Sequence, residues 1–487
     1  MTEREPFSRR RFLQLLAAAG ASQTFAGCGS ETTDAPVPAV EKVIVVGAGF
    51  SGLTVANALA SAGVAVEVIE GRDRLGGRLW TVDFGGTPID LGGAWMHGIE
   101  GNPVACFAAA NGISWTSAEV VDGTTSAFDP HSGFLPGMDL LEFVVGTMSR
   151  FEASIDEIRG ALGAQASLEQ AVAYYLDREG LRGDPRRYAD FALRQGIVEL
   201  FYGGPAELTS LTEIFRDEEF AGGNHFPSGG YGRMVEILAR DLDIRLGEVV
   251  ETISVADDGV RVETDGGVYR GSHVVVTVPL GILKAETIRF RPRLPEWKRA
   301  AIERLDMGNF EKVVLEFERS FWSEARRRNF VYLSDRYGEF PLYFDLGRYT
   351  RRPTLLCFYG GRFAREAAAL DDEQVTTRVL QILEQMFPGA VHPPVRVART
   401  RWFSDPFSYG SYSYVPVGAS LEDMDRLGDP VGARLLFAGE ATVPAYYGTV
   451  AAAMISGLRE ARRLLGRSAI DLSTGPAPDV GCSRSSA

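Results

Sequence analysis

A glycine-rich turn between two apolar segments places the strongest constraint on how this chain folds. Lys42–Val46 is a short β-branched run typical of a buried parallel strand, and the turn GAGFSG follows at 47–52. Ser51–Ala62 has helical periodicity, Gly63 stands where a helix ends, and Val64–Ile69 is typical of a second strand. The order strand, tight turn, helix, strand predicts the start of a doubly wound parallel sheet.

The spacing of these glycines predicts a dinucleotide site. Gly47 lets the strand turn into the helix, Gly49 leaves the backbone open to a pyrophosphate, and Gly52 lets helix and strand pack closely. The helix that begins at Ser51 offers free N–H groups and a positive dipole end to the phosphates. Glu70 ends the second strand, where it can accept hydrogen bonds from an adenosine ribose. A plain glycine turn is the alternative, and the complete strand–helix–strand–acid unit argues against it.

The residues after the second strand indicate which dinucleotide binds. Arg72 and the turn Gly76-Gly77-Arg78 make the pattern E-x-R-x-x-x-G-G-R, and DLGGAW follows at 90–95. This pattern resembles the flavin amine oxidase family: monoamine oxidases, polyamine oxidases, L-amino-acid oxidases and lysine-specific histone demethylases. The resemblance covers about Glu41 to Leu465 and implies FAD as the cofactor. It also implies cofactor contacts at Arg72, Gly77, Arg78, Gly93, Ala94, Trp95 and the backbone of Val250.

The run LFAGEAT at 436–442 resembles the family's second nucleotide motif. A strand is expected to end at Gly439, with Glu440 beside the ribityl or pyrophosphate part of FAD. Thr449 and Val450 begin a long helix whose positive end can stabilise negative charge on the reduced flavin. Monoamine oxidases hold FAD through a cysteine near this motif, and no cysteine stands between 402 and 465 here. We therefore expect non-covalent FAD.

Lys312 is the main catalytic candidate. It lies in MGNFEKVVLEF at 307–317, which resembles the family segment whose lysine holds a water against the flavin. A lysine in an apolar strand is unfavourable to bury unless it is paired or functional, and burial should lower its pKa. The alternative is a strand lysine whose ammonium reaches solvent.

Three other residues are candidates for the amine site. Trp402 and Tyr446 are expected to form aromatic walls that attract the substrate ammonium and exclude water. Many amine oxidases have a tyrosine where this chain has Thr449, so Tyr446 is expected to substitute for it. His97, in WMHG at 95–98, resembles the polyamine oxidase histidine that faces the substrate. Core packing is the alternative for each aromatic side chain, and a structural role is the alternative for His97.

The resemblance implies an α/β fold, in which a Rossmann-like FAD-binding domain of the glutathione-reductase type is interleaved with a mixed α+β substrate domain. The FAD-binding domain is expected at 41–101, 226–287 and 402–466, and the substrate-binding domain at 102–225 and 288–401. Residues 29–40 are a polar, proline-containing linker, and the tail at 467–487 is expected to be disordered.

The N-terminus predicts export. SRRRFLQ at 8–14 matches the twin-arginine consensus, and the apolar stretch Phe12–Ala26 is too short for a membrane-spanning helix. FAGC at 25–28 resembles a lipoprotein cleavage box, which would leave Cys28 as the lipidated first residue. These motifs imply the twin-arginine export machinery and a periplasmic protein, or one lipid-anchored at the outer face of a bacterial membrane. A disordered basic tail is the alternative.

Composition narrows the function classes. A net charge of −14 disfavours nucleic acid as a partner, and the four cysteines make no CxxC or metal-binding pattern. The expected activity is oxidation of a primary or secondary amine, with polyamines favoured. Hydride would pass to flavin, O2 would reoxidise the flavin to give H2O2, and the imine would hydrolyse to an aldehyde. The alternatives are an L-amino-acid oxidase, a flavin amine dehydrogenase with a non-oxygen acceptor, and an FAD-bound interaction protein.

Overall fold

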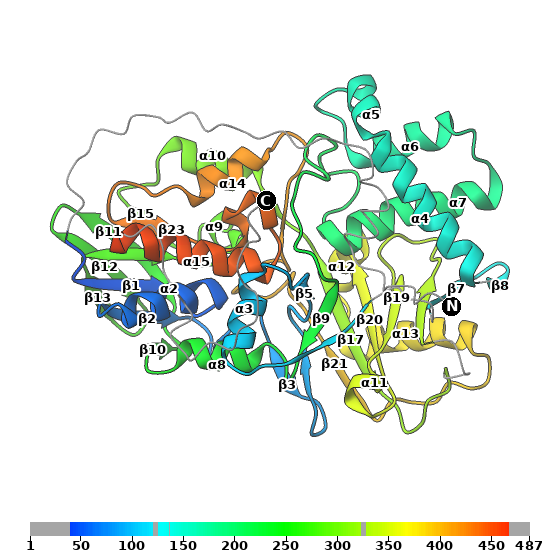
Figure 1. Ribbon diagram of the computed structural model, residues 1–487, viewed down its shortest axis with the longest axis horizontal. Helices are drawn as coiled ribbons and strands as arrows, with labels where there is room; N and C mark the ends of the chain where they lie inside the picture. The colour runs from blue at the N-terminus through cyan, green and yellow to red at the C-terminus, as the bar shows by residue number, and fades with distance from the viewer. Residues whose placement is uncertain (1–38, 120–124, 136, 323–327, 467–487) are drawn as a thin grey trace.

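The computed structural model describes residues 39–119, 125–135, 137–322 and 328–466. Figure 1 shows these residues as two halves that lie side by side. The predicted export signal, Cys28 and the predicted tail at 467–487 lie outside the described residues. In the part of the chain that is described, no helix is both long enough and apolar enough to cross a membrane.

A five-stranded parallel sheet organises the first half, and its strand order is β10-β2-β1-β14-β23. The central strands are β-branched and buried on both faces, which is the pattern of a parallel sheet covered by helices. The strands are β1 (Lys42–Val46), β2 (Ala65–Glu70), β10 (Asp243–Leu246), β14 (His273–Val276) and β23 (Leu435–Phe437). The predicted α/β fold with a Rossmann-like sheet is confirmed, while the exact domain limits stay predictions.

Helices α2 (Phe50–Ser61) and α15 (Val450–Leu465) pack against each other beside this sheet (Figure 1). Their contact is close, because a Cβ atom on Gly457 would lie 2.6 Å from the carbonyl oxygen of Ser51. Helices α3 (Pro103–Ala110) and α8 (Gly232–Ala239) also contact this pair. A second sheet, β13-β12-β11-β15, adds β11 (Val250–Ala256), β12 (Gly259–Thr264), β13 (Val268–Gly271) and β15 (Arg289–Arg291).

A seven-stranded sheet organises the other half, in the order β21-β17-β20-β19-β18-β7-β8. Helix α13 (Asp372–Met386) covers one face, where Val313 and Leu315 of β17 pack with Val379 and Leu383 of the helix. Its strands are β7 (Thr125–Asp129), β8 (Gly133–Phe134), β17 (Phe310–Glu316), β18 (Asn329–Tyr332), β19 (Leu342–Asp345), β20 (Thr354–Gly360) and β21 (Arg396–Arg399).

The remaining elements surround these sheets. The helical group at the upper right of Figure 1 contains α4 (Gly137–Ala153), α5 (Ile155–Leu162), α6 (Leu168–Arg178), α7 (Gly183–Phe191) and the π-helix η1 (Ala192–Tyr202). The other helices are α9 (Leu280–Lys284), α10 (Glu296–Arg304), α11 (Gly347–Thr350), α12 (Gly361–Ala367), α13 (Asp372–Met386), α14 (Leu421–Gly428), η2 (Glu440–Thr442) and η3 (Pro444–Tyr446). The short strands are β3 (Thr81–Asp83), β4 (Pro88–Asp90), β5 (Met96–His97), β6 (Trp115–Ser117), β9 (Asn224–Pro227), β16 (Asp306–Met307) and β22 (Ser413–Tyr414).

Candidate active site

A cavity of about 720 Å³ extends from the parallel sheet to the seven-stranded sheet. It brings together nearly all of the predicted site residues, although they come from segments far apart in the chain. The predicted residues that line it are Gly47, Gly49, Ser51, Glu70, Arg72, Gly77, Arg78, Gly93, Ala94, Trp95, His97, Val250, Lys312, Trp402, Gly439, Glu440, Thr449 and Val450. Gly52 and Tyr446 are the predicted residues that do not line this cavity.

The first glycine turn leaves a cradle open to a phosphate group. A Cβ atom on Gly52 would lie 2.0 Å from the carbonyl oxygen of Gly47, so only glycine fits there. Gly47 has φ +108°, a conformation that favours glycine. A Cβ on Gly49 would meet no atom within 4 Å and would occupy the cavity itself. Gly49 is the N-cap of α2 and supplies no side-chain cap, so the helix start can serve an anion.

Glu70 is held at the end of β2 by two main-chain donors. Its Oε2 accepts from the N–H of Ala48 at 2.7 Å, and its Oε1 accepts from the N–H of Arg72 at 2.8 Å. Burial raises the pKa of this carboxyl, and the two N–H donors oppose that rise. Each oxygen keeps a second lone pair, so the carboxylate can also accept ribose hydroxyl groups. The geometry therefore fits the adenosine end of FAD.

Arg72 contacts two side chains of a neighbouring loop, those of Asp405 and Phe407. Its guanidinium donates to both oxygens of Asp405, at 2.8 and 2.9 Å, and lies 5.2 Å from the ring centroid of Phe407. The bidentate pair ties the loop that contains Trp402 to the end of β2. A direct contact between Arg72 and the cofactor stays a prediction.

Glu440 joins three parts of the nucleotide site. Its carboxylate accepts from Arg78 Nη1 at 2.8 Å, from Ser413 Oγ at 2.6 Å and from the N–H of Gly448 at 2.8 Å. It therefore fixes the glycine–arginine turn, the strand β22 and the turn before α15 around one buried charge. Thr449 Oγ1 accepts from the N–H of Ala452 at 3.0 Å, so it caps α15 where the helix start faces the cavity.

Lys312 is buried in the cavity wall. Successive residues of a strand point to opposite faces, so Lys312 points away from the face that packs on α13. Its Nζ donates to the carbonyl of Asp90 at 3.0 Å and to that of Gly92, and it lies 5.5 Å from the ring centroid of Trp95. Burial lowers the pKa of Lys312 to about 8, and the charge of Asp90 opposes that shift. With 5% of the residue exposed, the alternative of a solvent-reaching lysine is wrong.

His97 belongs to a hydrogen-bonded chain that the sequence did not indicate. The buried Glu119 carboxylate accepts from the N–H and from Nδ2 of Asn224, both at 2.9 Å. Asn224 Oδ1 is thereby directed at His97 Nδ1, 2.8 Å away. Because an amide oxygen only accepts, Nδ1 of His97 carries the proton and Nε2 is the acceptor nitrogen. Glu119, Asn224 and His97 all line the cavity.

The aromatic wall differs from the prediction by one residue. Tyr446 lies outside the large cavity, where its ring stacks on Phe220 at 4.5 Å and its hydroxyl donates to Glu218 at 2.8 Å. Tyr447 lines the cavity instead. The 3₁₀ turn η3 ends between these two residues, which sends their side chains in different directions. Trp402 does line the cavity, with its ring 6.2 Å from that of Trp80.

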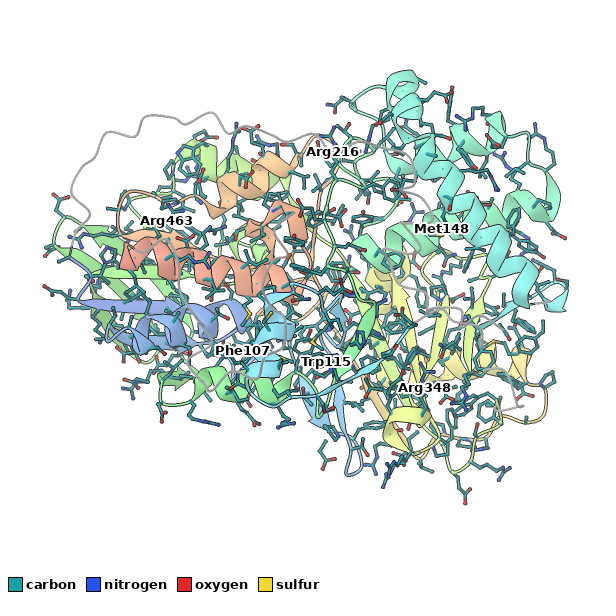
Figure 2. All side chains as sticks on the ribbon, in the orientation of Figure 1. Phe107, Trp115, Met148, Arg216, Arg348 and Arg463 are labelled. Atoms are coloured by element: carbon teal, nitrogen blue, oxygen red, sulfur yellow. The ribbon has the colours of Figure 1, made fainter. Side chains whose placement is uncertain are left out.

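One end of the cavity is lined by helices α4, α7 and η1. Met148, labelled on α4 in Figure 2, lines this end together with Tyr202 and Asp217. The Tyr202 hydroxyl donates to Asp217 at 2.8 Å. Burial, and then the charge of Asp217, raise the pKa of nearby Glu152 to about 7. Within the described ranges, no group of three or more His, Cys, Asp or Glu residues could hold a metal ion.

Comparisons with known proteins identify the family of this chain. Residues 50–465 match the family model described as flavin containing amine oxidoreductase. Probable polyamine oxidase 4 of Arabidopsis thaliana is 32% identical over 85% of this chain and 85% of its own length. Polyamine oxidase 2 of the same plant is 34% identical over 86% and 87%, respectively.

Two further comparisons concern a longer protein and a solved structure. Lysine-specific histone demethylase 1 homolog 3 of A. thaliana is 34% identical over 87% of this chain, but the match spans only 30% of that protein. A structure of redesigned putrescine oxidase superposes with a TM-score of 0.72 at 22% identity, covering 88% of this chain and 100% of that one. That likeness concerns the fold alone. The family match over most of the chain shows that this protein belongs to the flavin containing amine oxidoreductases, enzymes whose cofactor here is FAD.

Proposed function

We propose that this protein is an amine oxidase that oxidises a primary or secondary amine, with polyamines favoured, and that uses O2 as electron acceptor. The proposal rests on the buried Lys312 ammonium in the wall of a cavity that extends from the glycine turn at 47–52 to an aromatic chamber. We use this name for the part of the cavity lined by Trp95, Trp402 and Tyr447. When bound, FAD supplies the acceptor for hydride from the amine α-carbon and passes the electrons to O2 to give H2O2.

The chain's own residues would bind and orient the amine. Trp95, Trp402 and Tyr447 line the cavity and offer aromatic faces that attract a cation and exclude water. The carboxylates of Glu119 and Asp217 make the chamber favourable for an ammonium group. His97 presents Nε2 as an acceptor, so it can take a hydrogen bond or a proton from the amine before oxidation.

Lys312 would act on the oxygen side of the reaction. Two of its three N–H groups donate to carbonyl oxygens of Asp90 and Gly92, which leaves one for a group inside the cavity. A positive charge fixed there stabilises negative charge that develops as O2 is reduced. This favours O2 over a quinone as acceptor.

The arginines argue against the amino-acid alternative. A carboxylate on the substrate would need a cationic clamp in the chamber. Among the described residues, Arg72 and Arg78 are the arginines that line the cavity, and they pair with Asp405 and Glu440 in the nucleotide half. An amine without a carboxylate therefore fits better.

The decisive experiment is a peroxide-release screen. Protein reconstituted with FAD is offered spermidine, spermine, putrescine, simple monoamines and L-amino acids. Peroxide from a polyamine or monoamine supports the proposal. Lys312→Met should slow reoxidation, while Lys42→Met, at a half-buried ion pair with Glu67 that does not line the cavity, should not. Turnover of amino acids alone would favour the L-amino-acid oxidase. Flavin reduction without peroxide would favour a dehydrogenase with another acceptor.

We also propose non-covalent FAD and export. No cysteine lines the cavity among the described residues, so acid precipitation of the holoenzyme should release all of the flavin into the supernatant. Export to the periplasm or the outer membrane face rests on residues 8–14 and Cys28. Fractionation of cells that express Arg9→Lys/Arg10→Lys, compared with the unchanged chain, tests it: retention of the variant in the cytoplasm supports export, and equal distribution contradicts it.

A further inference from the structure

Asp90, whose main-chain carbonyl accepts from Lys312 Nζ at 3.0 Å, has a carboxylate that does not belong to the cavity lining. Asp90 Oδ1 accepts from the Thr81 hydroxyl, and both carboxylate oxygens lie 3.2 Å from the N–H of Tyr231. The N–H of Gly232 donates in turn to Thr81 Oγ1 at 2.7 Å. Tyr231 and Gly232 begin helix α8. The Asp90 carboxylate is therefore clamped by a hydroxyl and by the positive end of a helix.

The same segment binds Lys312 through its backbone. Lys312 Nζ donates to the carbonyl oxygens of Asp90 and Gly92, so one stretch of three residues supplies two neutral acceptors to the ammonium and also carries the Asp90 carboxylate. Gly92 is followed by Gly93, Ala94 and Trp95 in the cavity wall. A shift of the main chain at residues 90–92 would therefore move the acceptors of the ammonium relative to the cavity wall.

Asp90 and Lys312 each favour the charged form of the other. The charge of Asp90 is the one that supports the protonated form of Lys312 against burial. The charge of Lys312 supports the ionised form of Asp90, whose pKa burial raises to about 6. Tyr231 is the other titratable group that faces Asp90, and burial keeps its phenol protonated by raising its pKa well above the usual value. Its hydroxyl donates to the carbonyl of Trp95 at 3.2 Å.

We propose that Asp90 is a positioning residue for Lys312. Asp90 holds the Lys312 ammonium in the cavity wall and sets the pH range over which that wall is positively charged. The consequence for oxygen chemistry rests on the proposed amine oxidase function, whereas the coupling between the two groups does not. A clamp that merely anchors α8 is the rival interpretation.

The composition makes a direct test practicable, because the chain has four lysines: Lys42, Lys284, Lys298 and Lys312. Holoenzyme labelled with [ε-¹³C]lysine should give few signals, and Lys312→Met assigns the one of interest. Asp90→Asn keeps an amide oxygen to accept from Thr81 and Tyr231 but removes the charge. We expect the titration midpoint of Lys312 to fall by about 1 pH unit or more, while that of Lys298 stays in place.

Thr81→Val separates charge from anchoring, because it removes both hydrogen bonds of the Thr81 hydroxyl, to Asp90 and from the N–H of Gly232, and keeps the carboxylate. The proposal expects a smaller shift of the Lys312 midpoint in Thr81→Val than in Asp90→Asn; equal shifts, or an unchanged midpoint in Asp90→Asn, overturn it. If Asp90→Asn does not fold, the reciprocal measurement decides. In protein labelled with [γ-¹³C]aspartate, one carboxyl midpoint must rise in Lys312→Met, and the absence of such a signal overturns the proposal.

Activity provides a separate readout. In an active oxidase, the pH dependence of reoxidation should move by the same amount as the Lys312 midpoint in Asp90→Asn. A shifted midpoint in a protein that oxidises no amine would leave the coupling intact and refute the proposed function alone. A shifted reoxidation profile without a shifted midpoint would refute the role of Asp90.

Discussion

Replacing Glu119 by Gln should reverse the hydrogen-bonding polarity of His97 without unfolding the protein. The carboxylate accepts both donors of Asn224, which forces the amide oxygen of Asn224 toward His97 Nδ1. An amide at position 119 can accept only one of these donors. If its oxygen keeps the main-chain N–H, its NH2 group faces the side chain of Asn224. Asn224 then turns over, its Nδ2 faces His97, and the histidine proton moves to Nε2.

The size of the effect follows from one interaction. In the wild type, Nε2 can accept a charge-assisted hydrogen bond from the substrate ammonium, which is worth about 1.5–3 kcal/mol. Its loss lowers kcat/KM by about 10- to 150-fold. The substitution exchanges a buried carboxylate for a neutral amide of the same shape, so the unfolding temperature should change little. The expected signature is therefore a loss of kcat/KM in a stable, FAD-loaded protein.

The assay combines a double-mutant cycle with a tautomer measurement. His97→Ala removes the acceptor, so Glu119→Gln should cause no further loss of kcat/KM in that background. ¹⁵N chemical shifts of the imidazole distinguish Nδ1–H from Nε2–H, and the chain has only five histidines to assign. Equal losses of kcat/KM in both backgrounds, or an Nδ1–H tautomer that persists in Glu119→Gln, would refute the reasoning.

Three other perturbations test the cradle, the aromatic wall and a buried lysine. Gly49→Val should abolish flavin binding, measured by calorimetry, because the valine side chain enters the open cavity. Gly160→Val is the control and should leave flavin binding unchanged. A Cβ at Gly160 also meets no atom within 4 Å, but this residue lies far from the cradle. Tyr447→Leu should raise KM for the amine by about 2- to 30-fold through a lost cation–π contact, whereas the same change at Tyr446 should leave KM unaltered. Burial lowers the pKa of Lys298 to about 7 from 10.5. Between these pH values the unfolded chain therefore binds more protons than the folded protein. As pH rises from 7 to 10, the free energy of unfolding of the wild type, measured in urea, should increase by up to roughly 4 kcal/mol relative to that of Lys298→Met. A difference between the two proteins that does not change with pH contradicts this.

The nucleotide site was predictable because its chemistry is local in sequence. The glycines at 47, 49 and 52 and Glu70 stand within one strand–helix–strand unit, so their spacing alone determines their geometry. Lys312 was predictable for a related reason, since a charged residue inside an apolar strand requires an explanation. Each of these residues lines the cavity except Gly52, whose position is fixed by its contact with Gly47.

Glu119 and Asn224 could not be found in this way. They meet His97 because β9 pairs with both β5 and β6, and 105 residues separate Glu119 from Asn224 in the chain. Neither residue stands in a motif, and a single sequence contains no signal of such a pairing. The exchange of Tyr446 for Tyr447 has a different cause. A resemblance locates a segment, but the direction of each side chain depends on where a 3₁₀ turn ends.

The scarcity of lysine gives an independent argument that Lys312 is functional. Of 50 basic residues, four are lysines. Lys284 donates to carbonyls at the end of α10, and Lys298 to the carbonyls of Arg426, Leu427 and Asp429 at the end of α14. In each case a compact ammonium donates to several converging carbonyl oxygens. These two lysines therefore have a structural role at helix ends.

Lys312 makes the same kind of contact in a different setting. Its carbonyl acceptors belong to the cavity-lining loop rather than to a helix end, and of the four lysines it alone lines the cavity. Arginine is the common basic residue of this chain, and its longer, planar guanidinium would not place its charge where Lys312 Nζ meets the carbonyls of Asp90 and Gly92. The proposed function requires a small, titratable cation in the wall at this position, and Lys312→Arg should fail to restore the activity that Lys312→Met loses.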